Sequence, residues 1–210
     1  MIRILIADDH AIVRSGLKQI VTSAPDLEVA GEATSSQEVL ALVHAQPWDL
    51  VVLDIHMPGR GGLETLKELK REFPKLPVLV LSMYPEDQYA VRALKAGAAG
   101  YLSKDSAPDE LLTAIRRVLG GGKYISPAVA EQLAVAVNHT KTDKAPHELL
   151  SDREYQILCL IASGKTVSEI AAALTLSVKT VSTYRTRVLE KMQMKTNAEL
   201  THYAIRNELV

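Results

Sequence analysis

Five apolar runs of strand length alternate with five segments of helical periodicity in the first part of the chain. The strand-length runs are 2–7, 28–33, 50–53, 78–81 and 100–102. The helical segments are 10–24, 36–45, 62–72, 86–96 and 108–119. This alternation is typical of a parallel sheet with helices on both faces, because each parallel connection needs a crossover. We therefore predict an α/β fold with a five-stranded, doubly wound parallel sheet.

From Ser151 the alternation stops, and only helical periodicity remains. Capping boxes of the form Ser/Thr-x-x-Glu begin at Ser151, Thr166 and Thr196, and in each the hydroxyl and carboxylate can satisfy free amides at a helix start. Ser177 is a good N-cap residue for a further helix. The sequence therefore predicts a small all-α domain with a helix-turn-helix, in which the segment 174–177 is the short turn.

Between these two parts, a glycine triplet at 120–122 predicts the end of the last crossover helix. A short helix is expected at 127–137, and the polar run 138–147 is typical of a flexible linker. The expected organisation is an α/β domain at 1–120, a linker with a short helix at 121–147 and an all-α domain at 148–210.

Charge and hydropathy restrict the kind of protein. No apolar run approaches the roughly 18 residues of a membrane helix, so we expect a soluble, cytoplasmic protein with no membrane partner. The net charge of −1 is unevenly distributed, with 13 Lys and Arg against 16 Asp and Glu in residues 1–120, but six against two in residues 177–206. The local basic excess favours a docking face for an anion. The one cysteine, Cys159, lies in an apolar run and is expected to be a buried hydrophobe.

Polar residues follow four of the five strand-length runs. Asp8 and Asp9 follow the first, Asp54 the third, Ser82 the fourth and Lys104 the fifth. Ligands of open parallel sheets bind beyond the carboxyl ends of the strands, so these side chains are expected to meet. Clustered carboxylates repel one another, and Mg²⁺ would relieve that repulsion while leaving room for a phosphate. Acids after strands are also ordinary loop residues, but agreement at four strand ends favours a functional site.

The segments IADDH, VVLDIHMPG, LSM and GYLSK resemble those of response-regulator receiver domains, which have a flavodoxin-like fold. The resemblance covers residues 2–119. It implies that Asp54 accepts the phosphoryl group, that Lys104 pairs with its oxygens, and that Ser82 and Tyr101 are switch residues. It further implies that Mg²⁺ is held mainly by Asp9, with support from three other groups, Asp8, Asp54 and the backbone carbonyl of His56. Many receivers have a cis-proline after the lysine, whereas Asp105 follows Lys104 here.

The segment 151–207 resembles the LuxR-type helix-turn-helix of NarL/FixJ response regulators, through SDRE, SEIAAAL and SVKTVSTYRTRVLEKM. The resemblance implies that one set of side chains faces DNA bases, namely Ser182, Thr183 and Thr186. It implies that a second set faces DNA phosphates, namely Lys179, Thr180, Tyr184, Arg187 and Lys191. A helical wheel predicts an inner stripe of Val178, Val181, Val188, Leu189 and Met192. In the last helix, an apolar stripe of Leu200, Tyr203 and Ala204 suits either a dimer seam or an internal core.

Taken together, these features favour a two-component response regulator. A partner sensor histidine kinase would phosphorylate Asp54, and phosphorylation would control sequence-specific binding to double-stranded DNA by a homodimer. The alternative is a phosphohydrolase with Asp54 as a transient nucleophile. Such enzymes commonly carry a second acid two residues after the nucleophile, where this chain has His56. We therefore expect a regulator rather than an enzyme. The six histidines show no transition-metal spacing.

Overall fold

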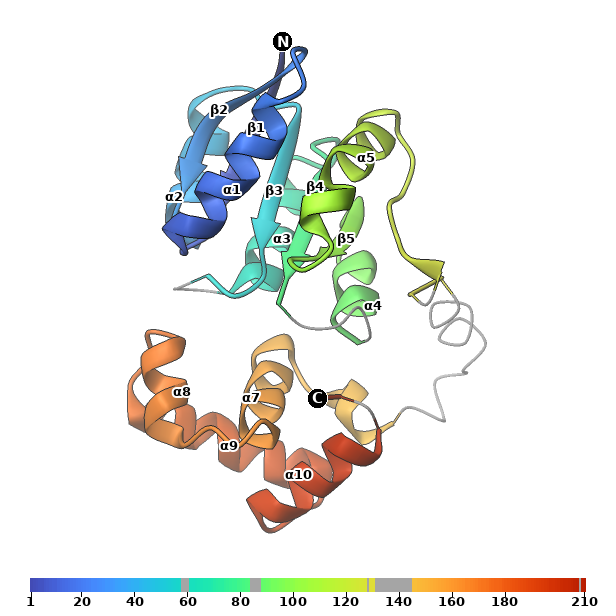
Figure 1. Ribbon diagram of the computed structural model, residues 1–210. Helices are drawn as coiled ribbons and strands as arrows, with labels where there is room; N and C mark the ends of the chain where they lie inside the picture. The colour runs from blue at the N-terminus through green and yellow to red at the C-terminus, as the bar shows by residue number, and fades with distance from the viewer. Residues whose placement is uncertain (58–60, 84–87, 128, 131–144, 208) are drawn as a thin grey trace. The chain divides into compact units, whose positions relative to one another are not determined.

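The computed structural model describes residues 1–57, 61–83, 88–127, 129–130, 145–207 and 209–210 (Figure 1). The chain forms two compact units, Met1–Leu133 and Ala134–Val210. The short helix expected at 127–137 and the linker expected at 138–147 lie largely outside the described residues.

The first unit contains a five-stranded parallel sheet. Its strands are β1 (Ile2–Ala7), β2 (Leu27–Ala33), β3 (Leu50–Asp54), β4 (Val78–Ser82) and β5 (Gly100–Ser103). The strand order β2-β1-β3-β4-β5 confirms the expected doubly wound sheet. Because the direction of winding reverses between β1 and β3, a crevice is expected at the carboxyl ends of these two strands.

Five helices cover the two faces of this sheet (Figure 1). They are α1 (Ala11–Thr22), α2 (Ser36–Ala45), α3 (Gly62–Glu72), α4 (Gln88–Lys95) and α5 (Ala107–Leu119). Helices α1 and α5 pack together over one face, and α2, α3 and α4 lie along the other. Alternate strand residues such as Ile4, Ile6 and Val52 join Leu17 and Leu111 in a buried core under α1 and α5. This period of two is what a sheet buried on both faces produces.

The second unit is entirely helical in its described part. It contains a 3-10 turn, η1 (Pro146–Leu149), and the helices α7 (Asp152–Ala162), α8 (Val167–Ala173), α9 (Val178–Met192) and α10 (Asn197–Arg206). Helix α7 is the centre of its core, because all of its residues from Arg153 to Ala162 are buried and it contacts α8, α9 and α10. Cys159 is fully buried there, as expected.

Capping determines where these helices begin. Ser151 and Thr166 form the expected capping boxes with Glu154 and Glu169, and Ser177 accepts a hydrogen bond from the Thr180 amide at 3.0 Å. At α10 the expected box is incomplete. The Thr196 hydroxyl caps the helix, but the Glu199 carboxylate accepts from the Lys195 amide at 2.8 Å rather than from the Thr196 amide.

The structure corrects the apolar stripe expected on α9 and decides between the two uses expected for the stripe on α10. On α9, Val181, Val188 and Met192 are buried, but Val178 is 51% exposed, because it is the first helical residue and lies at the end of the packed face. On α10, Leu200 and Ala204 are fully buried in a helix that packs against α7. These two residues of the stripe are therefore internal core, Tyr203 is half-buried beside them, and a seam between copies on α10 would use another face of the helix.

Candidate functional site

The carboxyl ends of β1, β3 and β5 bring two acids and a lysine together. The ammonium Nζ of Lys104 lies 2.6 Å from Asp8 Oδ2 and 2.8 Å from Asp54 Oδ2. Both carboxylates are fully buried, and the Lys104 side chain is 6% exposed. The Lys104 amide also donates to the Ser82 carbonyl at 2.8 Å, which fixes the lysine to the end of β4. Asp54 and Asp8, which precede Lys104 by 50 and 96 positions in the sequence, thus meet it in one polar cluster.

A short loop after β1 holds the acid pair. The His10 amide donates to Asp8 Oδ1 at 2.8 Å, and the Asp8 amide donates to the Ala33 carbonyl at 3.1 Å. Arg14, in the first turn of α1, donates to the Asp8 carbonyl oxygen at 2.7 Å. Its guanidinium also lies 3.4 Å from a Glu32 carboxylate oxygen. The loop is therefore fixed from three sides, which restricts where the carboxylates can point.

Burial and charge set the protonation of these groups. Burial raises the pKa of Asp54 and outweighs the attraction and hydrogen bond of Lys104, which act to lower it. Burial acts to lower the pKa of Lys104, but Asp54 and Asp8 raise it further than burial lowers it. Lys104 therefore stays charged at neutral pH, while the ionised form of Asp54 carries a cost that a second nearby cation would reduce.

The donor set fits a divalent cation with oxygen ligands. One ligand atom from each of Asp8, Asp9, His10 and Asp54 lies within 4.8 Å of the other three. The cluster contains three carboxylates, and Lys104 contacts only two of them, Asp8 and Asp54, so one lysine charge does not balance the site. Carboxylate oxygen is the ligand that Mg²⁺ prefers. The His56 amide donates to Asp54 Oδ1 at 2.9 Å, so the backbone at His56 adjoins the cluster.

His10 is a member of the cluster that sequence reasoning missed. Its Nδ1 lies 2.9 Å from Asp9 Oδ1 and 3.4 Å from Asp8 Oδ1. A search for paired histidines could not find it, because its partners are carboxylates. The useful signal was its position directly after two acids at a strand end.

The two expected switch residues lie in the strands beside this centre. Ser82 is the last residue of β4 and Tyr101 the second residue of β5, and both are fully buried. The Tyr101 ring is therefore already inside the fold. The Lys104–Asp105 peptide bond is trans.

Gly62 allows α3 to start directly against the backbone of Asp54. Its amide donates to the Ile55 carbonyl at 2.9 Å. A Cβ at this position would lie 2.4 Å from Ile55 Cα and 2.7 Å from the Asp54 carbonyl oxygen. No side chain fits there without moving the backbone that carries Asp54.

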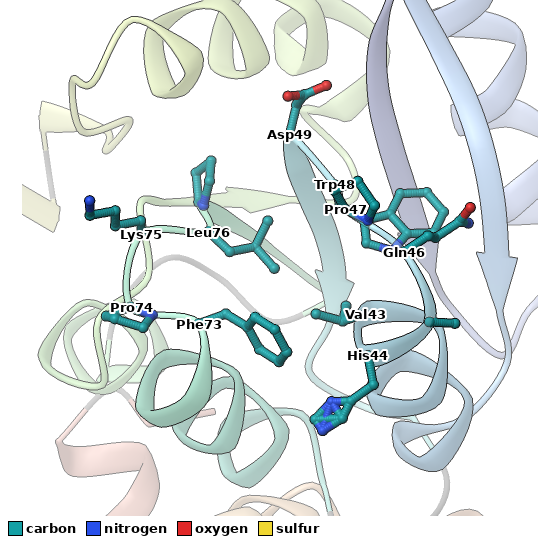
Figure 2. A pocket seen from close by; sticks show the side chains of 12 residues that line it. Val43, His44, Gln46, Pro47, Trp48, Asp49, Phe73, Pro74, Lys75 and Leu76 are labelled. Atoms are coloured by element: carbon teal, nitrogen blue, oxygen red, sulfur yellow. The ribbon is translucent and has the colours of Figure 1, made fainter.

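A separate hollow of about 790 Å³ lies at the amino ends of β3 and β4, at the opposite edge of the sheet from the acids (Figure 2). Figure 2 shows Phe73 and Leu76 among its lining side chains, with His44 at the end of α2. The indole nitrogen of Trp48, another lining residue, donates to the Leu42 carbonyl at 3.0 Å. The hollow is thus remote from the acidic cluster.

The outer face of α9 carries the residues expected to contact DNA. Ser182, Thr183, Thr186, Lys179 and Arg187 are exposed, and Thr180 and Tyr184 are partly exposed. The hydroxyls of Thr183 and Thr186 donate to carbonyls one turn earlier in the helix, at 3.0 and 3.1 Å. The Arg187 guanidinium lies 5.8 Å from the centre of the Tyr184 ring.

Two basic residues of α9 are instead held within the second unit. The Lys191 ammonium lies 2.6 Å from Glu154 Oε2 of α7. Arg185 donates through Nε to Asn197 Oδ1 of α10 at 2.6 Å. The sequence pattern could not distinguish these residues from the solvent-facing cations, because their partners are 37 and 12 positions away.

Both units match known families. Residues 4–116 match the response regulator receiver domain, and residues 148–204 match the bacterial regulatory proteins of the luxR family. None of the helices in the described part of the chain is long and apolar enough to cross a membrane.

Relatives match the whole chain. The response regulator UvrY of Escherichia coli O6:H1 is 38% identical over 209 residues, which cover 100% of this chain and 96% of that protein. The response regulator GacA of Pseudomonas viridiflava is 40% identical over 210 residues, covering 100% and 98%. The structure of RcsB from Salmonella enterica serovar Typhimurium bound to a promoter with phosphomimetic BeF3⁻ has a TM-score of 0.61 at 27% identity, covering 96% and 97%. The chain therefore belongs to the two-component response regulators that combine a receiver domain with a LuxR-type helix-turn-helix.

Proposed function

We propose that a partner sensor histidine kinase phosphorylates this chain at Asp54, and that phosphorylation controls sequence-specific binding to double-stranded DNA. The observation that carries the proposal is the Lys104 ammonium between two buried carboxylates, 2.8 Å from Asp54. In this proposal residues 1–120 are the receiver, 121–147 the linker and 148–210 the DNA-binding domain.

The transfer step forms a bond between phosphorus and an Asp54 carboxylate oxygen while the phosphorus–nitrogen bond of a phosphohistidine breaks. The departing imidazole takes a proton from solvent. Lys104 stabilises negative charge on the transferred group, because its ammonium already lies at the accepting carboxylate. When bound, Mg²⁺ supplies further neutralisation of that charge, and the groups that would hold it are Asp8, Asp9, Asp54 and the backbone carbonyl of His56.

Lys104, the partner of Asp54, is joined to Ser82 through the backbone. The Ser82 carbonyl accepts from the Lys104 amide, and Tyr101 lies in the neighbouring strand β5. A phosphoryl group brings up to two negative charges and three acceptor oxygens. We propose that the Ser82 hydroxyl moves toward these oxygens, and that Tyr101 adjusts within the space that Ser82 leaves.

On α9, we propose that Ser182, Thr183 and Thr186 read base edges in the major groove. Phosphate contacts are assigned to Lys179, Thr180, Tyr184 and Arg187. Lys191 is left out of this set, because Glu154 holds its ammonium.

A phosphohydrolase is less well supported. An enzyme with an aspartate nucleophile needs a proton donor for the leaving group, and residue 56 would have to supply it. Burial lowers the pKa of His56 to about 4, so its imidazole is unprotonated at neutral pH. We therefore expect one phosphoryl group per chain rather than repeated turnover.

The test is labelling by a radioactive acyl phosphate in the presence of Mg²⁺. Wild-type protein should incorporate one label per chain and Asp54→Ala none, while Asp105→Ala, which removes an exposed carboxylate beside Lys104, should label normally. Undiminished labelling of Asp54→Ala, or sustained phosphate release from a phosphomonoester, would contradict the proposal.

A further inference from the structure

An ion pair joins α9, the helix proposed to read DNA and here called the recognition helix, to the core of the second unit. Lys191 lies in the last turn of α9, and its Nζ is 2.6 Å from Glu154 Oε2. The Glu154 side chain is only 4% exposed, whereas that of Lys191 is 43% exposed. The carboxylate is thus inside the fold, and the lysine reaches inward to meet it.

Glu154 also caps the start of α7. The same oxygen, Oε2, accepts the Ser151 amide at 2.8 Å as part of the capping box. Burial acts to raise the pKa of Glu154, but the hydrogen bonds from Lys191 and Ser151 lower it further, so the carboxylate is ionised at neutral pH. A buried, ionised carboxylate is costly unless a cation stays beside it.

This arrangement conflicts with a direct phosphate contact by Lys191. To bind a DNA phosphate, the ammonium would have to leave Glu154, and the buried carboxylate would lose its only described cation. Helix α9 packs on α7, so the pair also fixes the last turn of the recognition helix against the centre of the domain. The second tether, Arg185 to Asn197, fixes the same helix to α10.

We infer that Lys191 is a positioning residue: through Glu154 it holds the angle at which α9 presents its reading face, and it does not itself contact DNA. The inference rests on the proposed DNA-binding function. The inference separates the basic side chains of the recognition helix that can bind DNA phosphates from those that are paired within the domain.

The two roles predict opposite effects of Glu154→Gln. Glutamine keeps an acceptor for the Ser151 amide but removes the negative charge that holds Lys191. If Lys191 contacts phosphate, the variant frees a cation and removes a nearby negative charge, so DNA binding becomes tighter. If Lys191 positions the helix, the variant loosens α9, and binding to a preferred sequence becomes weaker.

The experiment uses the full-length chain with an acyl phosphate and Mg²⁺. Two probes are compared over a range of salt concentrations: a duplex selected from random-sequence DNA by the wild-type protein, and sheared mixed-sequence DNA. The variants are Glu154→Gln, Lys191→Ala and their double mutant. Lys195→Ala, made in the wild-type chain and together with Glu154→Gln, is the matched control, since it removes an exposed cation just beyond α9 for which the described residues give no ion pair. Circular dichroism checks that each variant is folded.

For a positioning role, both single variants should bind the selected duplex about fivefold more weakly, with little change on mixed-sequence DNA. The double mutant should lose no more than either single variant, because both remove the same pair. The salt dependence for Lys191→Ala should match that of wild type. The change in DNA binding caused by Lys195→Ala should be the same in the wild-type chain and in the Glu154→Gln variant.

Tighter binding by Glu154→Gln, or a salt slope reduced by about 0.9 in Lys191→Ala, would overturn the inference, because that reduction corresponds to one lost phosphate contact. Equal loss on both probes would also overturn it, since a change in helix angle must affect sequence reading most. If wild-type protein selects no sequence, the proposed function fails, while the salt slope on mixed-sequence DNA still decides the role of Lys191.

Discussion

Lys104 and Asp54 form a hydrogen-bonded ion pair of 2.8 Å at the end of the sheet, in a place where the acid is fully buried. The same ammonium also contacts Asp8, so one lysine compensates two carboxylates. This sharing gives Lys104 two opposing influences. In the proposed function, it would stabilise charge on an incoming phosphoryl group, and it would compete with a bound metal ion for the same two carboxylates.

Lys104→Met should therefore change two measurements in opposite directions. Without the ammonium, Mg²⁺ affinity should rise about tenfold or more, which corresponds to about 1.4 kcal/mol, because uncompensated carboxylates attract the cation more strongly. The rate of labelling by an acyl phosphate should fall by at least about tenfold, because charge on the transferring group loses its fixed partner. Calorimetric Mg²⁺ titration and labelling kinetics measure the two effects. A variant that labels at the wild-type rate would show that Lys104 has no part in the transfer.

The raised pKa of Asp54 gives a pH-dependent stability prediction. Because the pKa in the folded protein lies above the ordinary value of 3.8, the unfolded chain loses this proton first as pH rises. At pH values above the ordinary pKa, ionisation of the buried Asp54 carboxylate therefore lowers the free energy of unfolding. In metal-free buffer, Asp54→Asn should be more stable than wild type at pH 7, and the difference should disappear as pH falls toward 4. Urea unfolding of both proteins between pH 4 and pH 8 measures the difference. A difference that grows on acidification would be inconsistent with the burial cost.

Arg14 should act on metal binding without touching the metal. It donates to the Asp8 carbonyl at 2.7 Å and is itself fixed near Glu32. Arg14→Ala should lower Mg²⁺ affinity by about tenfold, the smaller end of the loss seen when a group that orients a ligand is removed. Lys18→Ala is the control, because Lys18 pairs with Glu32 at 2.8 Å on the other carboxylate oxygen. Equal Mg²⁺ affinity in the two variants would refute this role of Arg14.

The exposed face of α10 should decide dimerisation. Ile205 is 62% exposed, whereas Leu200 on the opposite side is fully buried. Ile205→Glu should leave the domain folded and prevent the phosphorylated chain from forming a dimer in analytical ultracentrifugation. Ile12→Glu, at an equally apolar position on α1 that is 88% exposed, should dimerise normally. Leu200→Ala should instead destabilise the second unit by about 2–5 kcal/mol, because it leaves a cavity in the core. A dimer that survives Ile205→Glu would exclude this face.

The sequence alone was enough to predict the parallel sheet, the residues at its strand ends and the order of the helices. Periodicity works well there because strands buried on both faces are continuous apolar runs, and a residue at a strand end, such as Asp54 or Lys104, must lie at one edge of a parallel sheet. Local patterns could not reveal pairings across the fold. The partners of Lys191 and Arg185 depend on how helices pack. The buried side of α10 likewise follows from its contact with α7, and its own stripe suited two uses equally well.

The most direct test of the account is DNA binding by the full-length chain with and without phosphorylation. Wild-type protein treated with an acyl phosphate and Mg²⁺ should bind a duplex selected from random-sequence DNA at least about tenfold more tightly than untreated protein, and as a dimer on two half-sites. Asp54→Ala should bind equally with and without the acyl phosphate, at the level of untreated wild type. If wild-type binding is unaffected by phosphorylation, or if Asp54→Ala still responds to it, then phosphorylation of Asp54 does not control DNA binding in this protein.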